Sequence, residues 1–242
     1  GLSDRTIFAE ALNVFQKTEG PFYGFIVTLS GHHPYDFEGL DDGSFPLPKE
    51  MRETLLGDYI IAMNYFDREL GKFLRGLASS GLDKKSLIVL YGDHPAVPIA
   101  YKDEMEKLIG KKIEETIEWK ETRRVPLIFH ISGVKGKSGT IYSDTGQMDI
   151  LPTTAGLLGV KIETCFGKDL SQRNGSDPVI FRNGSYIIDG VFVEPAVRRA
   201  TRIGTHESVD ASEYDEITKE VDRRLSYNDI ILEKNLISDI LN

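Results

Sequence analysis

The fold is decided by the stretch "SLIVLYGDHPAVPI", Ser86–Ile99, in which an apolar run ends on Asp93 and His94. The run is short and continuous, which is typical of a buried strand. Gly92 before the pair and Pro95 after it favour a turn, so we expect the strand to cover Leu87–Tyr91 and to end there. Neighbouring side chains within a strand point to opposite faces, whereas a turn allows both to point the same way. Asp93 and His94 could therefore act together on one ligand.

Two further apolar segments have the length of strands, Phe22–Leu29 and Val125–Ile131. Segments with helical spacing of apolar residues lie before and between the three strands. This order predicts an α/β fold with a mostly parallel sheet that is flanked by helices. Ligands of such sheets bind at the carboxyl ends of the strands. That rule gives functional weight to two places, "SGHHPYD" after the first strand and "GDHP" after the second.

Helices are indicated wherever apolar residues recur at intervals of three and four. Asp4 is the expected cap of the first helix, and a second covers residues 51–77 and ends at Gly81. "GQMDILPTTAGLLGV" predicts a helix that ends at Gly159. These helices supply the cover that the predicted sheet needs.

The last third of the chain predicts smaller elements. "NG" at 183–184 lies between two apolar runs, which indicates a β-hairpin. The acidic tail after Glu207 predicts two helices, the second beginning near Ser226 with Asp229 as its capping partner. The acidic excess itself is expected to form a solvated helix face.

Composition limits the function classes. A net charge of −9 argues against a nucleic-acid binder, and an anionic substrate would need a local cation. A single cysteine, Cys165, excludes an internal disulfide and a cysteine-based zinc cluster, and it is expected to be a small buried apolar residue. No apolar run approaches the roughly eighteen residues that span a bilayer. No signal peptide opens the chain, and its first residues already predict a helix inside a domain, so we expect a piece of a longer protein.

The aspartate–histidine pair suits a metal. A carboxylate next to an imidazole suits Mn²⁺, Zn²⁺ or iron, whereas Mg²⁺ and Ca²⁺ prefer oxygen ligands alone. The alternative is an aspartate that accepts hydrogen bonds from backbone amides at a loop start, beside a surface histidine. Spacing alone leaves both interpretations of Asp93 and His94 open.

His32 and His33 follow the first predicted strand. Adjacent histidines in a loop can hydrogen-bond a phosphate, act as acid or base, or simply be exposed. Two histidine-containing loops at neighbouring strand ends favour a functional role for one member of this pair. Asp36 is expected to stabilise the turn that follows.

Other polar residues have simpler interpretations. We expect His130 to be a core or sheet-face histidine, His206 to be exposed and Arg182 to support the hairpin. Gln147 and Asp149 are expected to cap the start of a helix. No phosphate-binding glycine loop, nucleophile elbow or HExxH motif is present, so serine and cysteine hydrolases have no positive support.

Taken together, the motifs resemble the lipoteichoic acid synthase family. "GLSDRTIFAEAL", "PFYGFIVTLSGHHPY", "LIVLYGDH", "VPLIFHISG", "GQMDILPTTAGLLGV" and "FGKDLSQRNGSDPVIFRNGSYI" occur in the order of that family. Its members are phosphoglycerol transferases with a sulfatase-like domain of the alkaline phosphatase superfamily. The resemblance implies that residues 1–170 form the C-terminal half of the sulfatase-like core. Residues 171–242 would add antiparallel strands and an acidic helical tail to the same domain.

The resemblance also implies site residues and a metal. The family uses a threonine nucleophile and one Mn²⁺ or Mg²⁺ ion. Asp93 and His94 match its metal-binding pair, and His32 matches the histidine that contacts the phosphate or glycerol of the substrate. His33 falls on a variable position.

The family's nucleophile and first carboxylate ligand lie upstream of the stretch at which this chain begins. Thr28, Thr153 and Thr154 do not occupy the nucleophile motif. We therefore expect no catalytic nucleophile here and no turnover by the isolated chain, unless the N-terminal half is supplied as a partner.

The implied function is part of a metal-dependent transferase that moves glycerol phosphate from a phosphatidylglycerol-like lipid to a glycerol or teichoic-acid acceptor. The transfer would pass through a phosphothreonine, at the extracellular face of a bacterial cell membrane. Two alternatives stay open: a sulfatase or phosphodiesterase of the same superfamily, and a noncatalytic module that binds glycerol phosphate. The loops "HHPY" and "FRNG" favour the transferase.

Overall fold

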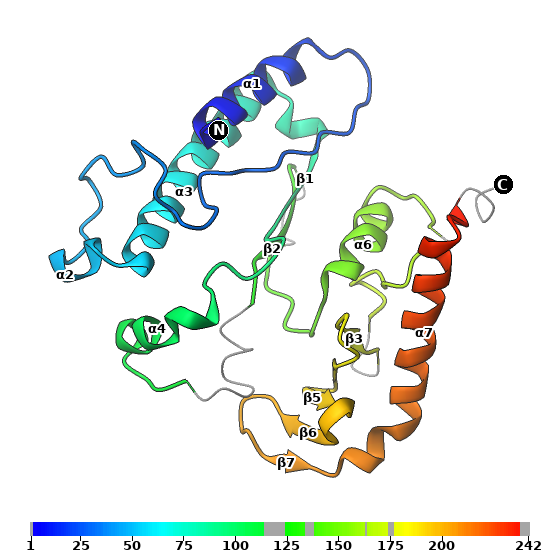
Figure 1. Ribbon diagram of the computed structural model, residues 1–242. Coiled ribbons are helices and arrows are strands. Elements are labelled where there is room, and N and C mark those ends of the chain that lie inside the picture. Colours follow the sequence, from blue (N-terminus) through cyan, green and yellow to red (C-terminus); the bar gives the residue numbers. More distant parts are fainter. Residues whose placement is uncertain (1, 114–123, 134–137, 163, 174–176, 238–242) are drawn as a thin grey trace. The chain divides into compact units, whose positions relative to one another are not determined.

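The structure is a computed structural model that describes residues 2–113, 124–133, 138–162, 164–173 and 177–237 (Figure 1). The chain divides into two compact units, Gly1–Gly136 and Lys137–Asn242. The predicted division after residue 170 stays a prediction. No helix in the described ranges is long and apolar enough to cross a membrane.

Unit 1 begins with the predicted helix, α1, which spans Asp4–Lys17. The prediction that Asp4 caps this helix is wrong, because the side chain of Ser3 accepts the hydrogen bond from the amide of Thr6. A serine at this position satisfies a helix amide and leaves the next residue's carboxylate for other contacts. Asp4 makes such contacts with a distant segment, as described below.

The second predicted helix is divided in two. α2 spans Lys49–Arg52 and α3 spans Leu55–Ser80. The side chain of Thr54 accepts from the amide of Gly57 and so starts α3 as a separate helix. Gly81 ends α3 at a φ of 75°, as predicted, since glycine adopts this left-handed conformation without strain.

α1 packs on α3 through aromatic side chains. Phe8 stacks on Phe73 with ring centroids 5.0 Å apart, and Leu77 completes the buried cluster. Gly76 of α3 faces Leu12, where a Cβ would lie 2.3 Å from a methyl carbon. The two helices therefore approach closely and form one layer of unit 1.

The strands of unit 1 form a two-stranded sheet. β1 spans Leu87–Tyr91, as predicted, and pairs with β2, Leu127–Ile131. The pairing is antiparallel, with Leu87 opposite Ile131, so the expected parallel order is not formed among the described residues. Another helix, α4, covers Lys102–Ile109.

The predicted strand Phe22–Leu29 is extended but is not part of a sheet in the described residues. A strand requires hydrogen-bonded neighbours, and Phe22–Thr28 make no backbone hydrogen bond to any described residue. The prediction of a strand paired within this chain is therefore wrong. The short apolar run was sufficient to predict an extended segment, but it carries no information about the partner.

Unit 2 contains an antiparallel sheet of five strands in chain order. These are β3 (Val179–Ile180), β4 (Tyr186–Ile188), β5 (Val191–Glu194), β6 (Arg199–Arg202) and β7 (Ser208–Val209). The "NG" turn joins β3 to β4 as predicted, with Gly184 at a φ of 82°. α6, Ile150–Leu157, is the helix predicted from the "GQMD" motif.

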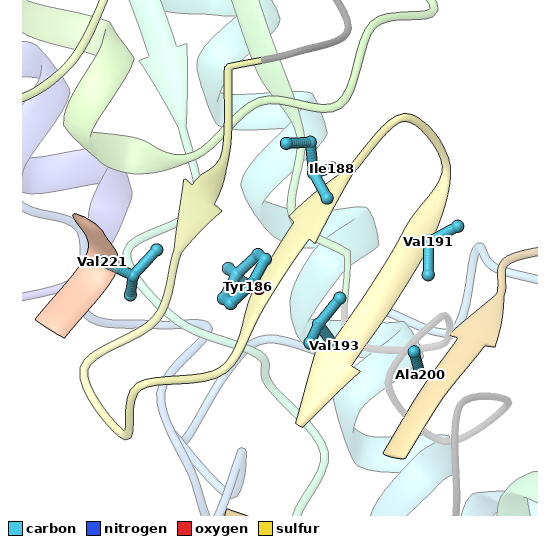
Figure 2. Close-up of a cluster of buried hydrophobic side chains, with 6 residues drawn as sticks. All are labelled: Tyr186, Ile188, Val191, Val193, Ala200 and Val221. Atoms are coloured by element: carbon cyan, nitrogen blue, oxygen red, sulfur yellow. The ribbon is translucent and has the colours of Figure 1, made fainter. Parts of the chain in front are cut away.

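The helix α7, Asp215–Glu233, covers one face of this sheet. Figure 2 shows Val221 of α7 beside the buried side chains of the strands, which are Tyr186, Ile188, Val191, Val193 and Ala200. The prediction of a second helix starting at Ser226 is wrong. Ser226 donates to the carbonyl of Asp222 one turn earlier, so α7 continues through it.

Asp149, expected to cap a helix, has a larger structural role. Its fully buried carboxylate lies 2.9 Å from the guanidinium of Arg173, which is also buried. It accepts hydrogen bonds from the amides of Gly146 and Lys168 as well. Asp149 therefore connects the start of α6 to a loop about twenty residues away.

Candidate functional site

Asp93 and His94 lie directly after β1, as the sequence predicted. Gly92 holds this strand end against the neighbouring strand, because its amide donates to the carbonyl of Pro126 at 3.1 Å. A Cβ at Gly92 would lie 2.7 Å from the Cβ of Val125, so no larger residue fits there without displacing the chain. The close approach of the two segments determines where the pair emerges.

The pair is ordered by its own hydrogen bonds. Asp93 accepts from the amide of His94 at 2.9 Å, and Nδ1 of His94 lies 2.9 Å from the carbonyl of Pro95. Nε2 of His94 lies 3.8 Å from the Asp93 carboxylate. Both side chains are mostly exposed, at 76% for Asp93 and 59% for His94. They are accessible to a ligand from outside unit 1.

His32 lies in the loop that follows the extended segment. Its amide donates to the carbonyl of Leu29 at 3.1 Å, and its Nδ1 lies 2.7 Å from the carbonyl of His33. The ring of His32 is perpendicular to that of His94, with centroids 6.3 Å apart. The structure therefore brings together the three residues that the sequence singled out, from two segments about sixty residues apart.

Asp4 fixes the chain just before His32, a role that the sequence analysis did not reveal. The buried carboxylate of Asp4 accepts from the amides of Leu29 at 2.8 Å and Ser30 at 3.0 Å. The amide of Asp4 donates in return to the hydroxyl of Ser30. The start of α1 is thus connected to the end of the extended segment. The only available signal was an aspartate directly after a helix-capping serine.

Tyr35 is a second residue that the sequence did not reveal. Its buried side chain donates from the hydroxyl to the carbonyl of Ala96, two residues after His94. Burial, with a smaller contribution from Tyr59, raises the pKa of the Tyr35 hydroxyl, so it stays a donor. Tyr35 therefore holds the loop of His32 against the loop of Asp93 and His94. Its signal in the sequence was an aromatic residue within an otherwise polar loop.

His33 lies beside two tyrosine rings. Its ring lies 5.6 Å from that of Tyr35 and 6.3 Å from that of Tyr101, between centroids. Near the loop, burial and the charge of Asp36 raise the pKa of Asp58.

The remaining polar residues lie as follows. His130 is exposed on β2, and His206 is exposed in a loop of unit 2. Arg182 pairs with Asp229 of α7 at 2.9 Å, so it supports the hairpin as predicted. Cys165 is partly buried.

The residues around His94 fit one part of a metal site. Asp93 and His94 supply a carboxylate and an imidazole, and Nδ1 of His94 on a carbonyl leaves Nε2 as the ligand atom, a usual arrangement at metals. Within the described ranges, no group of three or more histidine, cysteine or carboxylate side chains is placed to hold an ion. A stable site needs more ligands than these two.

Known proteins share both the sequence and the fold. Residues 1–160 match the family described as Sulfatase. Lipoteichoic acid synthase 1 of Bacillus subtilis (strain 168) is 30% identical over 98% of this chain and 36% of its own length. Lipoteichoic acid synthase of Staphylococcus aureus (strain USA300) is 28% identical over the same shares. The chain therefore spans about a third of the length of these relatives.

A solved structure supports the same relationship. The crystal structure of the lipoteichoic acid synthase LtaP from Listeria monocytogenes matches 96% of this chain and 59% of its own, with a TM-score of 0.82 and 26% identity. This likeness confirms the predicted α/β, sulfatase-like fold class. The chain belongs to the sulfatase family and is similar, over almost its whole length, to the lipoteichoic acid synthases.

Proposed function

We propose that this chain is part of a metal-dependent phosphoglycerol transferase. It moves glycerol phosphate from a phosphatidylglycerol-like lipid to a glycerol or teichoic-acid acceptor, at the extracellular face of a bacterial cell membrane. The observation that carries the proposal is the convergence of His32 with Asp93 and His94. Similarity to lipoteichoic acid synthases over 98% of the chain supports the substrate class.

Asp93 and His94 would hold the ion, Mn²⁺ or Mg²⁺, together with ligands from another part of the enzyme. When bound, the ion lowers the pKa of a hydroxyl nucleophile and screens charge on the phosphoryl oxygens. Asp93 and its neighbour lie at an exposed strand end, so they are accessible to both the remaining ligands and the substrate.

His32 contacts the glycerol phosphate. Its Nδ1 lies at the carbonyl of His33, which leaves Nε2 for the substrate. The neutral ring accepts a hydrogen bond from a glycerol hydroxyl at Nε2, and the protonated ring donates one to a phosphoryl oxygen. His32 therefore orients the substrate beside the ion.

The nucleophile and the remaining metal ligands come from a different segment. Thr153 donates to the carbonyl of Asp149, and Thr154 donates to that of Ile150, so both hydroxyls are occupied by hydrogen bonds one turn back along the chain. We propose that the partner is the N-terminal half of the same domain. Its threonine hydroxyl would form a phosphate ester with the glycerol phosphate as diacylglycerol leaves, and an acceptor hydroxyl would then take the group and regenerate the threonine. The isolated chain has no transferase turnover.

The test is a donor assay on the complete enzyme. Phosphatidylglycerol, an aryl sulfate and a simple phosphodiester are compared as substrates, and we expect turnover of the lipid alone. His32→Ala, Asp93→Ala and His94→Ala should each lower kcat/KM about 10²-fold or more. His130→Ala, on an exposed face of β2, is the matched control. Preferred turnover of the sulfate or the simple diester would instead identify a hydrolase, and unaffected variants would reject the site.

A further inference from the structure

The extended segment Phe22–Leu29 is firmly positioned, although it belongs to no sheet among the described residues. One side of the segment packs on the helical layer. The ring of Phe22, which is still 42% exposed, lies 4.9 Å from that of Phe15, and Ile26 packs on the cluster that contains Phe8 and Phe73. The amide of Leu29 is bonded to Asp4. Figure 1 shows this blue segment without an arrow, passing beneath α1.

The other side of the segment is apolar and exposed. Four large side chains occupy every second position: Tyr23 at 85% exposure, Phe25 at 62%, Val27 at 58% and Leu29 at 48%. Alternation of packed and exposed side chains is the geometry of a strand with one face covered. A row of exposed aromatic and aliphatic side chains on such a strand marks an interaction surface.

The backbone of the segment is also available. Phe22–Thr28 make no backbone hydrogen bond to any residue in the described ranges. Consecutive amides and carbonyls in an extended chain are satisfied in pairs by another extended chain, which adds a strand to the edge. A helix or a flat surface would not match this spacing. The expected neighbour is therefore a strand that pairs with this backbone and belongs to a part that also covers the exposed apolar side chains.

We propose that Phe22–Leu29 docks a β-strand of the other half of the sulfatase-type domain. The inference rests on the proposed function, because it assigns the place where the segment with the nucleophile joins this chain. The Listeria chain supports this occupant, since the match covers 96% of this chain but only 59% of the Listeria one. The rest of that chain has no counterpart here.

The position of the segment supports the same occupant. Leu29 is bonded through its carbonyl to the amide of His32, so a strand that runs along Phe22–Leu29 ends next to the candidate site. A single partner then supplies both the missing strand and the missing ligands. A second copy of this chain would supply the strand but would bring another incomplete site.

Hydrogen exchange tests the docking directly. The exchange of the amides from Tyr23 to Thr28 is measured by mass spectrometry on the full chain, alone and with the part of the Listeria LtaP chain that has no counterpart here. We expect fast exchange in the chain alone and a slowing of about 100-fold or more at saturation.

A matched pair of variants locates the surface. Phe25→Lys places a charge on the exposed face of the segment and should weaken binding of the Listeria polypeptide at least about tenfold, without unfolding α1. Tyr142→Lys, at a residue that is 92% exposed in unit 2, is the control and should bind as the parent does. Helical protection in both variants shows that each is folded.

Each other outcome overturns the docking. Amides protected in the chain alone at every concentration would mean that this chain covers the segment, and protection that grows with chain concentration would identify a second copy. Absence of binding, or binding without protection, would also reject it. Failure of the proposed function would give a different result. If the amides are protected but the complete enzyme does not transfer glycerol phosphate, the docking is supported and the proposed activity is rejected. Asp93→Ala should leave the protection unchanged.

Discussion

Tyr35 is the residue that joins the two loops of the candidate site. It adopts a φ of 69°, which is rare outside glycine, and its ring is buried beside Tyr59 at 5.2 Å between centroids. Its hydroxyl donates to the carbonyl of Ala96. A residue kept in an unfavourable backbone conformation by packing and one hydrogen bond determines the relative position of His32 and His94.

We predict that Tyr35→Phe lowers the free energy of unfolding of unit 1 by about 1–2 kcal/mol, because the carbonyl of Ala96 loses a buried donor. In the complete enzyme the variant should also lower kcat/KM, since the two loops are no longer connected. Urea unfolding and the donor assay measure these effects. Tyr142→Phe, at an exposed residue, is the control. An unchanged stability in Tyr35→Phe would contradict this role.

The candidate residues differ in how far the sequence could identify them. Asp93, His94 and His32 were identifiable because chemically distinctive side chains follow apolar runs. Asp4 and Tyr35 were not, because their partners lie 25 and 61 positions away. A hydrogen bond across such a distance leaves no local pattern in one sequence. Family resemblance pointed to the residues that we propose to contact ligands, but not to the residues that position them.

At the scale of elements, α1 and α3 are connected by a polar contact beside their aromatic core. The side chain of Glu69 on α3 is only 2% exposed. Its Oε1 forms ion pairs with Nζ of Lys72 at 2.8 Å and with the guanidinium of Arg5 on α1 at 3.4 Å. Burial alone would raise the pKa of Glu69, but the hydrogen bonds from Lys72 and Arg5 outweigh it and lower that pKa. The ionised carboxylate is therefore a stabilising part of the helix pair.

This lowered pKa predicts a specific acid dependence. A carboxyl whose pKa is lower in the folded state stabilises the fold above the unfolded value of 4.5, and the effect is lost as the pH falls through the folded value. Glu69→Gln should cost about 1–2 kcal/mol at pH 7, since both cations are half exposed. The variant and the parent should converge in acid.

Urea unfolding of unit 1 between pH 3 and pH 7 measures this convergence. Glu10→Gln, at an exposed position on α1, is the matched control and should follow the parent at every pH. A constant difference between Glu69→Gln and the parent at all pH values would mean that packing, not charge, explains the loss.

The elements show where sequence patterns suffice. β1 has the predicted bounds because its apolar run ends at residues that cannot continue a strand. Phe22–Leu29 has an equally clear pattern but no neighbour in the described ranges, and pairing is a property of two segments. Ser226 was misleading because a serine hydroxyl can cap a helix or bond back within one.

The whole molecule consists of two units, which differ in how far their strands are paired and covered. Unit 2 has a five-stranded sheet with α7 packed on its core. Unit 1 has a two-stranded sheet, an extended segment with an exposed apolar face, and the candidate metal ligands Asp93 and His94, which belong to no larger group of such ligands in the described ranges. The fold class was predictable from motif order, whereas the strand pairing was not.

An incomplete site predicts weak metal binding. The chain alone should bind Mn²⁺ with a Kd of roughly 1 mM, a free energy of about −4 kcal/mol, because two protein ligands leave most of the coordination to water. Isothermal titration calorimetry measures the affinity. Asp93→Ala should remove the binding, and His206→Ala should not. Micromolar binding by the chain alone would contradict a site that needs ligands from a partner.

The hydrogen bonds of Asp4 have a practical consequence for spectroscopy. Because they join the start of α1 to the chain just before His32, a fluorophore close to Asp4 lies near the candidate site. Leu2 is 60% exposed and tolerates a cysteine for labelling, once Cys165 is replaced by serine to make the label unique. Paramagnetic Mn²⁺ would then quench the emission on binding. The first residues of the chain are thus a natural place from which to observe the site.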